Sequence, residues 1–501
     1  MADTTANEGN ISIKLMVCKQ ENRVIFAEAD SNFVDTLFSF MTLPMATIVR
    51  LLKKCPHENL EVLRSLTNLY QSLINLSLDH FSTEESKFMM LNSRSSSFDQ
   101  CRKLKLNIDD TVPITNYFVC QNLSCGKRVG PFFSTSNFAR CSFCGTLTNW
   151  ESKYEGSTTV NTQVASFDGS VFVCDGLTFI ITDDLRVMPK TSDSSILLLR
   201  GLGITDASQL EERTLDISHQ QILILLRSAL LFKNPLTELV FPCMHHILHV
   251  VDYIQGSSVQ HLISNEIGTS AKKMTLKVAL QKSTSKFLFA EADEDFVEFV
   301  FGFLEIPLGT VIGKLMNGST SVDSFDNLFS SISNMRVGKY IKSQDLKDML
   351  LNPQLEQKSI SQYQIFPLNV ANSSQDHIIC SKKSCVRISK KSFGLKSRKS
   401  SKCIPQTIIP NSREFKTSRV QESFLKAPVK FMLTDDLVIT PLSFVSAIAL
   451  LNKLNVPVDD VEEHELIIGV EEGLKILKAS LKSSSTLSDA LFDGNSSSRN
   501  D

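Results

Sequence analysis

Two stretches of the chain nearly repeat each other. Residues 11–52 read ISIKLMVCKQENRVIFAEADSNFVDTLFSFMTLPMATIVRLL, and residues 274–315 read MTLKVALQKSTSKFLFAEADEDFVEFVFGFLEIPLGTVIGKL. They align without a gap, and both contain the motif FAEAD, followed after two residues by a phenylalanine–valine pair. Similarity at so long a spacing is typical of a duplicated domain, because solenoid repeats are only about 20–50 residues long.

The similarity continues toward the end of each stretch. The motif TDDL occurs at residues 182–185 and again at residues 434–437, each time with a proline a few residues later. Residues 236–241 likewise resemble residues 487–492. We therefore predict two tandem copies at residues 11–241 and 274–492, a linker at residues 242–273 and a disordered tail at residues 493–501.

Each copy begins with the pattern of a β-hairpin that leads into helices. Apolar and polar residues alternate over residues 11–17, and the alternation returns after a polar turn. Asp30 is a preferred N-cap residue, and Phe33, Leu37 and Phe38 would share one face of the helix after it. The TDDL motif separates two apolar runs, which predicts a second hairpin before the C-terminal helices. The sequence therefore predicts an α+β fold.

Composition excludes several classes of protein. The chain has 501 residues, 42% of them hydrophobic, and 52 basic against 54 acidic residues give a net charge of −2. This balance argues against nucleic-acid binding through overall charge and against an acidic disordered chain. The N-terminus lacks the apolar run of a secretory signal, and the stretch at residues 222–232 is too short to cross a bilayer. We expect a soluble intracellular protein of the cytoplasm or nucleus, with cysteines that are reduced or bind metal.

The strongest candidate site is a set of four cysteines at residues 120–145 of the first copy. Cys120 and Cys125 enclose four residues, and Cys141 and Cys144 enclose two. Four thiolates at such spacing can bind Zn²⁺ tetrahedrally, so we predict a structural zinc in a small zinc-ribbon-like insert. The alternative is four unliganded thiols in a loop. A closed four-thiolate site leaves no position for water, so it would stabilise the fold and not catalyse a reaction.

The corresponding segment of the second copy, residues 380–403, is degenerate. It keeps Cys380 and Cys385 but has only Cys403 after them, so zinc would need a further ligand such as His377, and we expect that the site is lost. The segment is basic, and we interpret it as a solvated loop. Its candidate contacts with an anion or nucleic acid are Lys382, Lys383, Arg387, Lys396, Arg398 and Lys399.

Other candidate sites have weaker support. His245 and His249 of the linker are spaced to share a helix face, but packed histidines are commoner than metal ligands at such spacing. The paired aspartates of the two TDDL motifs could serve acid–base or metal chemistry, but acids are also expected in turns between strands. The sequence contains no Walker A loop, no GxSxG elbow and no HExxH motif. A shared catalytic set is therefore not predicted.

The hairpin–helix start with FAEAD, the cysteine segment and the TDDL segment together resemble the plant domain-of-unknown-function 674 family, which often has two copies of the domain. The resemblance covers nearly the whole chain. It implies a plant protein with a duplicated α+β architecture, and it implies no activity, substrate or catalytic residue. We therefore expect a non-catalytic protein-interaction module stabilised by a structural zinc. Two alternatives stay open: a nucleic-acid-associated protein that uses the basic loop, and an enzyme with an unrecognised site.

Overall fold

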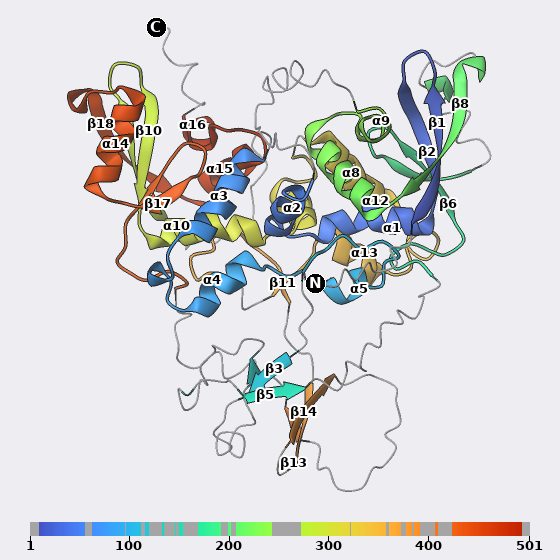
Figure 1. Ribbon diagram of the computed structural model, residues 1–501, viewed down its shortest axis with the longest axis horizontal. Coiled ribbons are helices and arrows are strands. Elements are labelled where there is room, and N and C mark those ends of the chain that lie inside the picture. The colour runs from blue at the N-terminus through green and yellow to red at the C-terminus, as the bar shows by residue number, and fades with distance from the viewer. Residues whose placement is uncertain are drawn as a thin grey trace, which may run out of the picture.

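The chain forms two five-stranded sheets with helices between them and two three-stranded sheets to one side (Figure 1). A further short parallel pair joins β11 (Leu355–Glu356) and β12 (Val370–Ala371). The computed structural model describes residues 10–55, 63–95, 97–111, 116–119, 133–134, 146, 150–153, 169–191, 199–201, 207–242, 272–320, 322–356, 360–371, 377–382, 385–390, 406–408 and 423–492. The predicted α+β fold class is confirmed. We call residues 11–241 the first half and residues 274–492 the second half.

The two large sheets have the same antiparallel strand order. The first is β7 (Val187–Pro189), β6 (Thr178–Thr182), β2 (Arg23–Asp30), β1 (Ile11–Cys18) and β8 (Leu210–Ile217). The second is β17 (Ile439–Pro441), β16 (Phe431–Leu433), β10 (Lys286–Ala292), β9 (Met274–Gln281) and β18 (Val461–Ile468). The register also agrees, because Leu15 lies opposite Ala27 and the equivalent Val278 lies opposite Ala290. The two halves therefore share one topology.

Most of the helices lie between the two large sheets, and one, at residues 444–454, covers the opposite face of the second sheet. Those of the first half are α1 (Ser31–Ser39), α2 (Met45–Leu52), α3 (Arg64–Asn75), α4 (Glu84–Leu91), α5 (Phe98–Cys101), α8 (His219–Leu231) and α9 (Pro235–Val240). Those of the second half are α10 (Glu294–Phe301), α11 (Leu308–Thr310), α12 (Asp323–Asn334), α13 (Gln344–Leu351), α14 (Phe444–Leu454), α15 (Val470–Ser480) and α16 (Thr486–Leu491). As predicted, Asp30 caps α1, because its Oδ1 accepts a hydrogen bond from the Phe33 N–H at 3.1 Å.

The second half contains one extra residue in its second helix. Residues 311–315 form a π-helical turn directly after α11, whereas α2 of the first half is a regular α-helix. Gly313 lies in this turn, and a Cβ atom there would be 2.9 Å from the Leu351 carbonyl oxygen. A π turn accommodates one inserted residue within a helix. The ungapped sequence alignment places Gly313 against Arg50, but with the extra residue Lys314 takes that position.

The halves exchange helices. The first half's α3 packs on β17 and α15 of the second half, and the second half's α12 packs on β7 and α8 of the first (Figure 1). The hydroxyl of Ser72 in α3 accepts a hydrogen bond from the Ile439 N–H at 2.9 Å, and Ser331 in α12 accepts one from the Val187 N–H at 3.0 Å. One continuous apolar core consequently contains residues of both halves.

The centre of the exchange lies at two equivalent prolines. Pro44 and Pro307 form an antiparallel bridge, in which the Met45 N–H donates to the Ile306 carbonyl at 3.1 Å and the Leu308 N–H donates to the Leu43 carbonyl at 3.0 Å. The structure shows that the two prolines are the N-caps of α2 and α11 and also the place where the two halves meet.

Two small three-stranded sheets lie below the body in the view of Figure 1. The first half contributes β3 (Asn116–Val119), β4 (Phe133–Ser134) and β5 (Trp150–Lys153); the second contributes β13 (His377–Lys382), β14 (Cys385–Lys390) and β15 (Gln406–Ile408). The solvated-loop prediction for residues 380–403 is wrong where β13 and β14 form a hairpin. β13 contains two adjacent isoleucines, and valine and isoleucine alternate with polar residues in β14; these residues favour strands despite the lysines. The rest of that segment, the linker over residues 243–271 and the tail from residue 493 lie outside the described residues.

Candidate functional site

The predicted zinc ligands lie beside the first small sheet. Cys120, Cys125, Cys141 and Cys144 are outside the described residues, so the zinc-ribbon-like insert stays a prediction. The flanking strands are described: Val119 pairs with Phe133 of β4 on one side and with Trp150 of β5 on the other. Cys120 directly follows Val119, and residue 149 directly precedes Trp150. The segment with Cys120 and Cys125 therefore starts beside the point where the segment with Cys141 and Cys144 ends.

The basic candidates are divided between strands and undescribed segments. Lys382 ends β13 and Arg387 lies in β14, whereas Lys383, Lys396, Arg398 and Lys399 are outside the described residues, as is Cys403. Cys380 lies opposite Arg387, and Cys385 lies opposite Lys382. The strand β14 is in contact with β5, so the cysteine segment of one half and the basic segment of the other are joined. The sequence contained no signal for this contact.

The first aspartate of each TDDL motif caps a helical segment. Asp183 accepts hydrogen bonds from the N–H and the hydroxyl of Thr237 at 2.8 and 2.6 Å. Asp435 accepts the same pair of bonds from Ser488, again at 2.8 and 2.6 Å. Burial raises the pKa of Asp183 to about 6, although the bonds from Thr237 act to lower it. These acids hold α9 and α16 against the hairpin turns, in agreement with their prediction as turn residues.

The second aspartate of each motif joins the halves. The amide of Asn327 in α12 donates to the carbonyl and carboxylate of Asp184 at 2.9 and 3.1 Å. The amide of Asn68 in α3 donates to the carbonyl and carboxylate of Asp436 at 3.0 and 2.9 Å. Sequence analysis missed both asparagines. The repeated spacing Asn-x3-Ser at residues 68–72 and 327–331 was the signal that could have identified them.

A second pair of equivalent acids is buried on the first helix of each half. Asp35 accepts hydrogen bonds from the backbone N–H groups of Phe172 and Val173 at 3.0 and 2.9 Å, and a third from Val171. Glu298 accepts bonds from the Leu425 N–H at 2.6 Å, the Ser361 hydroxyl at 2.6 Å and the Ser423 hydroxyl. Burial raises the pKa of Asp35 to about 6, against the three N–H groups that lower it. We call these two groups the carboxylate clamps.

Each clamp holds a segment that pairs with the other half. Residue 173 forms a β-bridge with Ile341, and residue 425 forms the equivalent bridge with Phe81. The Lys342 N–H donates to the Phe172 carbonyl at 3.0 Å, and the Ser82 N–H donates to the Phe424 carbonyl at 2.8 Å. The clamps therefore fix the backbone on which the exchanged segments dock.

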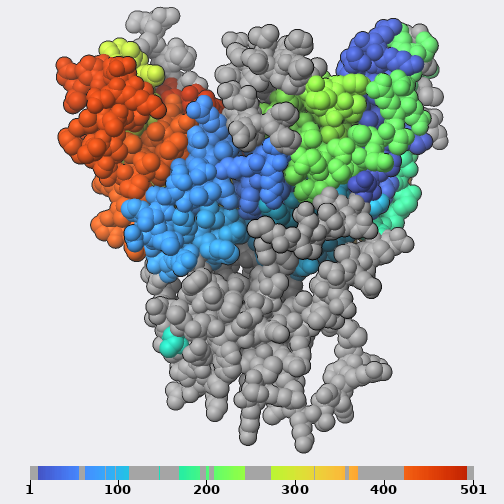
Figure 2. All heavy atoms as spheres, viewed as in Figure 1, coloured from blue at the N-terminus to red at the C-terminus, as the bar shows by residue number. Residues whose placement is uncertain are grey.

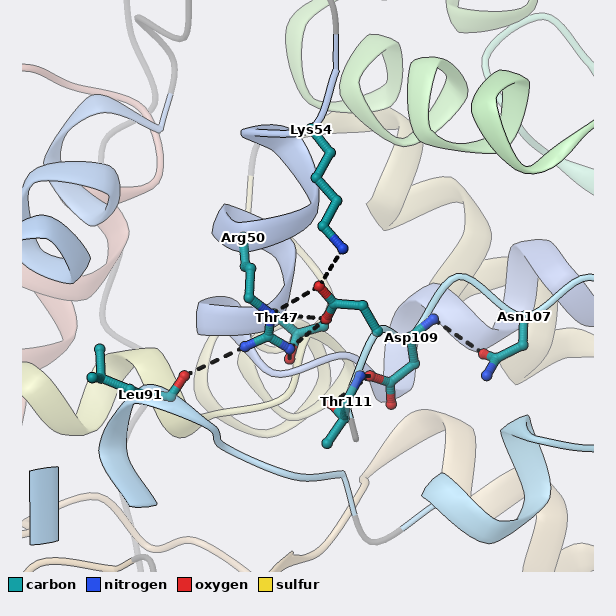
Figure 3. Close-up of polar contacts among 8 residues, drawn as sticks. Thr47, Arg50, Lys54, Leu91, Asn107, Asp109 and Thr111 are labelled. Carbon is teal, nitrogen blue, oxygen red and sulfur yellow. Dashed lines mark hydrogen bonds and ion pairs between the residues drawn. The ribbon is translucent and has the colours of Figure 1, made fainter. Parts of the chain in front are cut away.

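An ion-pair cluster distinguishes the halves. Figure 3 shows Arg50 and Lys54 of α2 converging on one carboxylate, which belongs to Asp110. The Arg50 Nε–H donates to Asp110 Oδ1 at 2.8 Å, and Lys54 donates to Oδ2 at 2.7 Å. Burial opposes ionisation of Asp110, but these bonds outweigh it and lower the pKa. In the second half, the equivalent pair is Lys314 and Asn369, joined by a hydrogen bond without a carboxylate.

These acids and bases take part in hydrogen bonds and ion pairs within the chain. Among the described residues, no three histidine, cysteine, aspartate or glutamate side chains converge as metal ligands would. His245 and His249 of the predicted linker are not among those residues. None of the helices in the described ranges combines the length and apolar character that crossing a bilayer requires.

Comparison with known proteins gives a family and no closer relative. No curated protein and no solved structure is found to match the chain. One family model, described as "Protein of unknown function (DUF674)", matches residues 7–471 in a single stretch. That stretch includes both large sheets, their exchanged helices and both small sheets. The chain therefore belongs to the DUF674 family.

Proposed function

We propose that the chain is a non-catalytic intracellular protein that binds a protein partner and contains a structural zinc in its first half. The observation that carries the proposal is the use of the repeated acids. Asp184, Asp436 and the two carboxylate clamps accept hydrogen bonds that hold the exchanged segments in place. Acids engaged in this way stabilise the fold and are poorly placed to transfer protons to a substrate.

The zinc proposal rests on the four cysteines and on the strands around them. The small sheet of β3, β4 and β5 contains only short strands, joined by the long segments at residues 120–132 and 135–149. So small a sheet buries little apolar surface, and a metal is a common substitute for such a core. Cys120, Cys125, Cys141 and Cys144 would hold the ion, which would supply folding energy to the insert.

Metal analysis of the purified full-length protein tests the zinc site. We expect about one zinc per chain, lost in Cys141→Ser, since a closed site requires all four thiolates. A chelator should also lower the melting temperature of the wild type more than that of Cys141→Ser. Cys174→Ser is the matched control, because Cys174 is a free thiol in the body of the first half. Absence of stoichiometric zinc, or full retention in Cys141→Ser, would refute the site.

A second candidate function is nucleic-acid binding, favoured by the contact between β14 and β5. The basic segment alone offers few aromatic residues for base stacking. The contact places β14, with Arg387 and Lys390, beside β5, which begins with the only tryptophan of the chain, Trp150. Cationic residues beside an aromatic strand are typical of single-strand binding surfaces.

Capture of partners with and without nuclease separates the two functions. Partners of the tagged full-length protein that survive nuclease support a protein-binding role. Partners that disappear with nuclease support the second candidate. In that case, salt-sensitive binding of a single-stranded oligonucleotide should weaken when Lys396, Arg398 and Lys399 are neutralised.

A further inference from the structure

The outer face of α14 is exposed and apolar. Phe444 is 82% exposed, Val445 is 76% exposed and Ile448 is 37% exposed. The other side of the helix is anchored, because Ala447, Leu450 and Leu451 pack with Phe289 and Met432 of the second large sheet. Ile448 lies four residues after Phe444 and three after Val445, so it neighbours both on the helix surface and the three exposed residues make a continuous surface. In Figure 2, the orange surface that includes α14 lies at the outer edge of the molecule.

The fold does not require this surface to be apolar. Aligning the TDDL motifs places Ser192 and Asp193 of the first half against Phe444 and Val445. The helix also has its own start signal, because the Ser446 N–H donates to the Ser443 hydroxyl at 3.0 Å. Large apolar side chains at positions where the equivalent segment has a hydroxyl and a carboxylate indicate a contact outside the fold.

The charge of the surface indicates its occupant. Residues 437–452 contain no aspartate, glutamate, lysine, arginine or histidine. In a two-fold symmetric interface each residue meets residues of the same patch, so a charged patch would oppose like charges, whereas an uncharged patch would not. A membrane surface would instead favour several lysine and arginine residues around the apolar stripe, whereas α14 has only Lys453, in its last turn.

We propose that α14 packs against α14 of a second copy of the chain, burying Phe444, Val445 and Ile448 from each copy. This association goes beyond the proposed partner binding and needs neither the zinc nor the small sheets. The helix has 11 residues, so it is only about 16 Å long. One such helix pair buries less than the roughly 800 Å² per partner of a standard interface. The dimer should therefore be weak and depend on concentration.

Sedimentation of the full-length protein over about 1–200 µM tests the proposal. The wild type should shift from monomer to dimer across this range. Phe444→Ser with Val445→Asp introduces the residues of the first half and should raise the dissociation constant at least about tenfold, because it removes the apolar contact and opposes two like charges. The matched control is Phe88→Asp, which adds the same charge at a phenylalanine that is also exposed, at 62%, but lies on α4.

Circular dichroism of each variant shows whether it is folded. All three substitutions are on the surface, and an acid in the first turn of α14 suits the helix dipole. Three outcomes would overturn the proposal. The wild type could stay monomeric over the whole range. The double variant could dimerise as strongly as the wild type while folded. Phe88→Asp could weaken the dimer as much as the double variant does, which would place the interface elsewhere.

Discussion

The two halves fill one region of the core with different residues. The first half has Thr36 and Ile222 at two buried positions where the second half has Phe299 and Gly473. A Cβ atom on Gly473 would lie 2.7 Å from Phe299 Cζ, so the large ring and the missing side chain are matched. The halves therefore preserve the volume of a pair of positions and not the identity of either residue.

Placing the first-half residue at only one of these two positions should cause the largest loss of stability. Gly473→Ile alone forces a side chain into the Phe299 ring and should lower the free energy of unfolding by about 3 kcal/mol or more. Phe299→Thr alone leaves a cavity and should cost about 3–5 kcal/mol, partly through lost contacts with Phe303 and Phe366, whose ring centroids lie at 5.1 and 5.2 Å. The double variant should recover at least about 2 kcal/mol of the summed cost.

Urea unfolding of the two single variants and the double variant completes this cycle. Additive costs would show that the two positions are independent, and the volume-matching comparison would then be wrong. Gly201→Ala is a suitable control, because a Cβ atom there meets no atom within 4 Å.

The sequence predicted local structure well and the exchange not at all. The hairpins, the cap at Asp30 and the TDDL turns follow from alternation, capping chemistry and turn acids, which are local properties. The partners of Asn68 and Ser72 lie more than 350 residues away in the chain. Periodicity shows which face of α3 is buried but cannot show which sheet covers it. A repeat in sequence does not indicate that α3 and α12 each pack on the other half.

The carboxylate clamps should differ in strength. Asp35→Ala would leave three buried N–H groups without an acceptor, and we expect a loss of about 3–5 kcal/mol in the free energy of unfolding. Glu298→Ala would leave two hydroxyls, which can rotate to other acceptors, and the N–H groups of Leu425 and Phe424, so about 2 kcal/mol is expected. Denaturant melts of both variants measure the difference. Equal losses would mean that the number of N–H groups does not set the strength of a clamp.

The free energy of unfolding should depend on pH through Asp35. Burial raises the pKa of Asp35 to about 6 in the folded protein, against 3.8 for an unperturbed aspartate. Between these values the folded state binds the proton more tightly than the unfolded state does. The stability from this group is therefore complete below about pH 4 and is lost as the pH rises to 6, by on the order of 2–3 kcal/mol. Asp35→Asn cannot ionise, so its free energy of unfolding should fall less from pH 4.5 to 6.5 than that of the wild type. An unchanged slope would refute the assignment.

Equivalent substitutions at the ion-pair cluster should give a smaller difference in stability between the two halves. Arg50→Met leaves Asp110 with Lys54 alone at a position where the carboxylate is only 17% exposed, and about 2 kcal/mol should be lost. Lys314→Met removes one hydrogen bond to a neutral amide and should cost at most about 1 kcal/mol. Thermal or urea unfolding of the two variants measures the two losses. A larger loss for Lys314→Met would show that the carboxylate is not what makes the first-half contact stronger.

The smallest difference is expected at the exchanged asparagines. Asn68 and Asn327 each donate to the carbonyl and the carboxylate of an aspartate in the other half, at distances that agree within about 0.2 Å. Asn68→Ala and Asn327→Ala should therefore each cost about 1–2 kcal/mol and differ by less than about 0.5 kcal/mol. Because the two contacts lie at separate turns, the double variant should show the sum of the two losses. Unequal single losses would mean that one half contributes more to the exchange. A double loss well above the sum would mean that each exchanged helix stabilises the other, so that the two halves form a single cooperative unit.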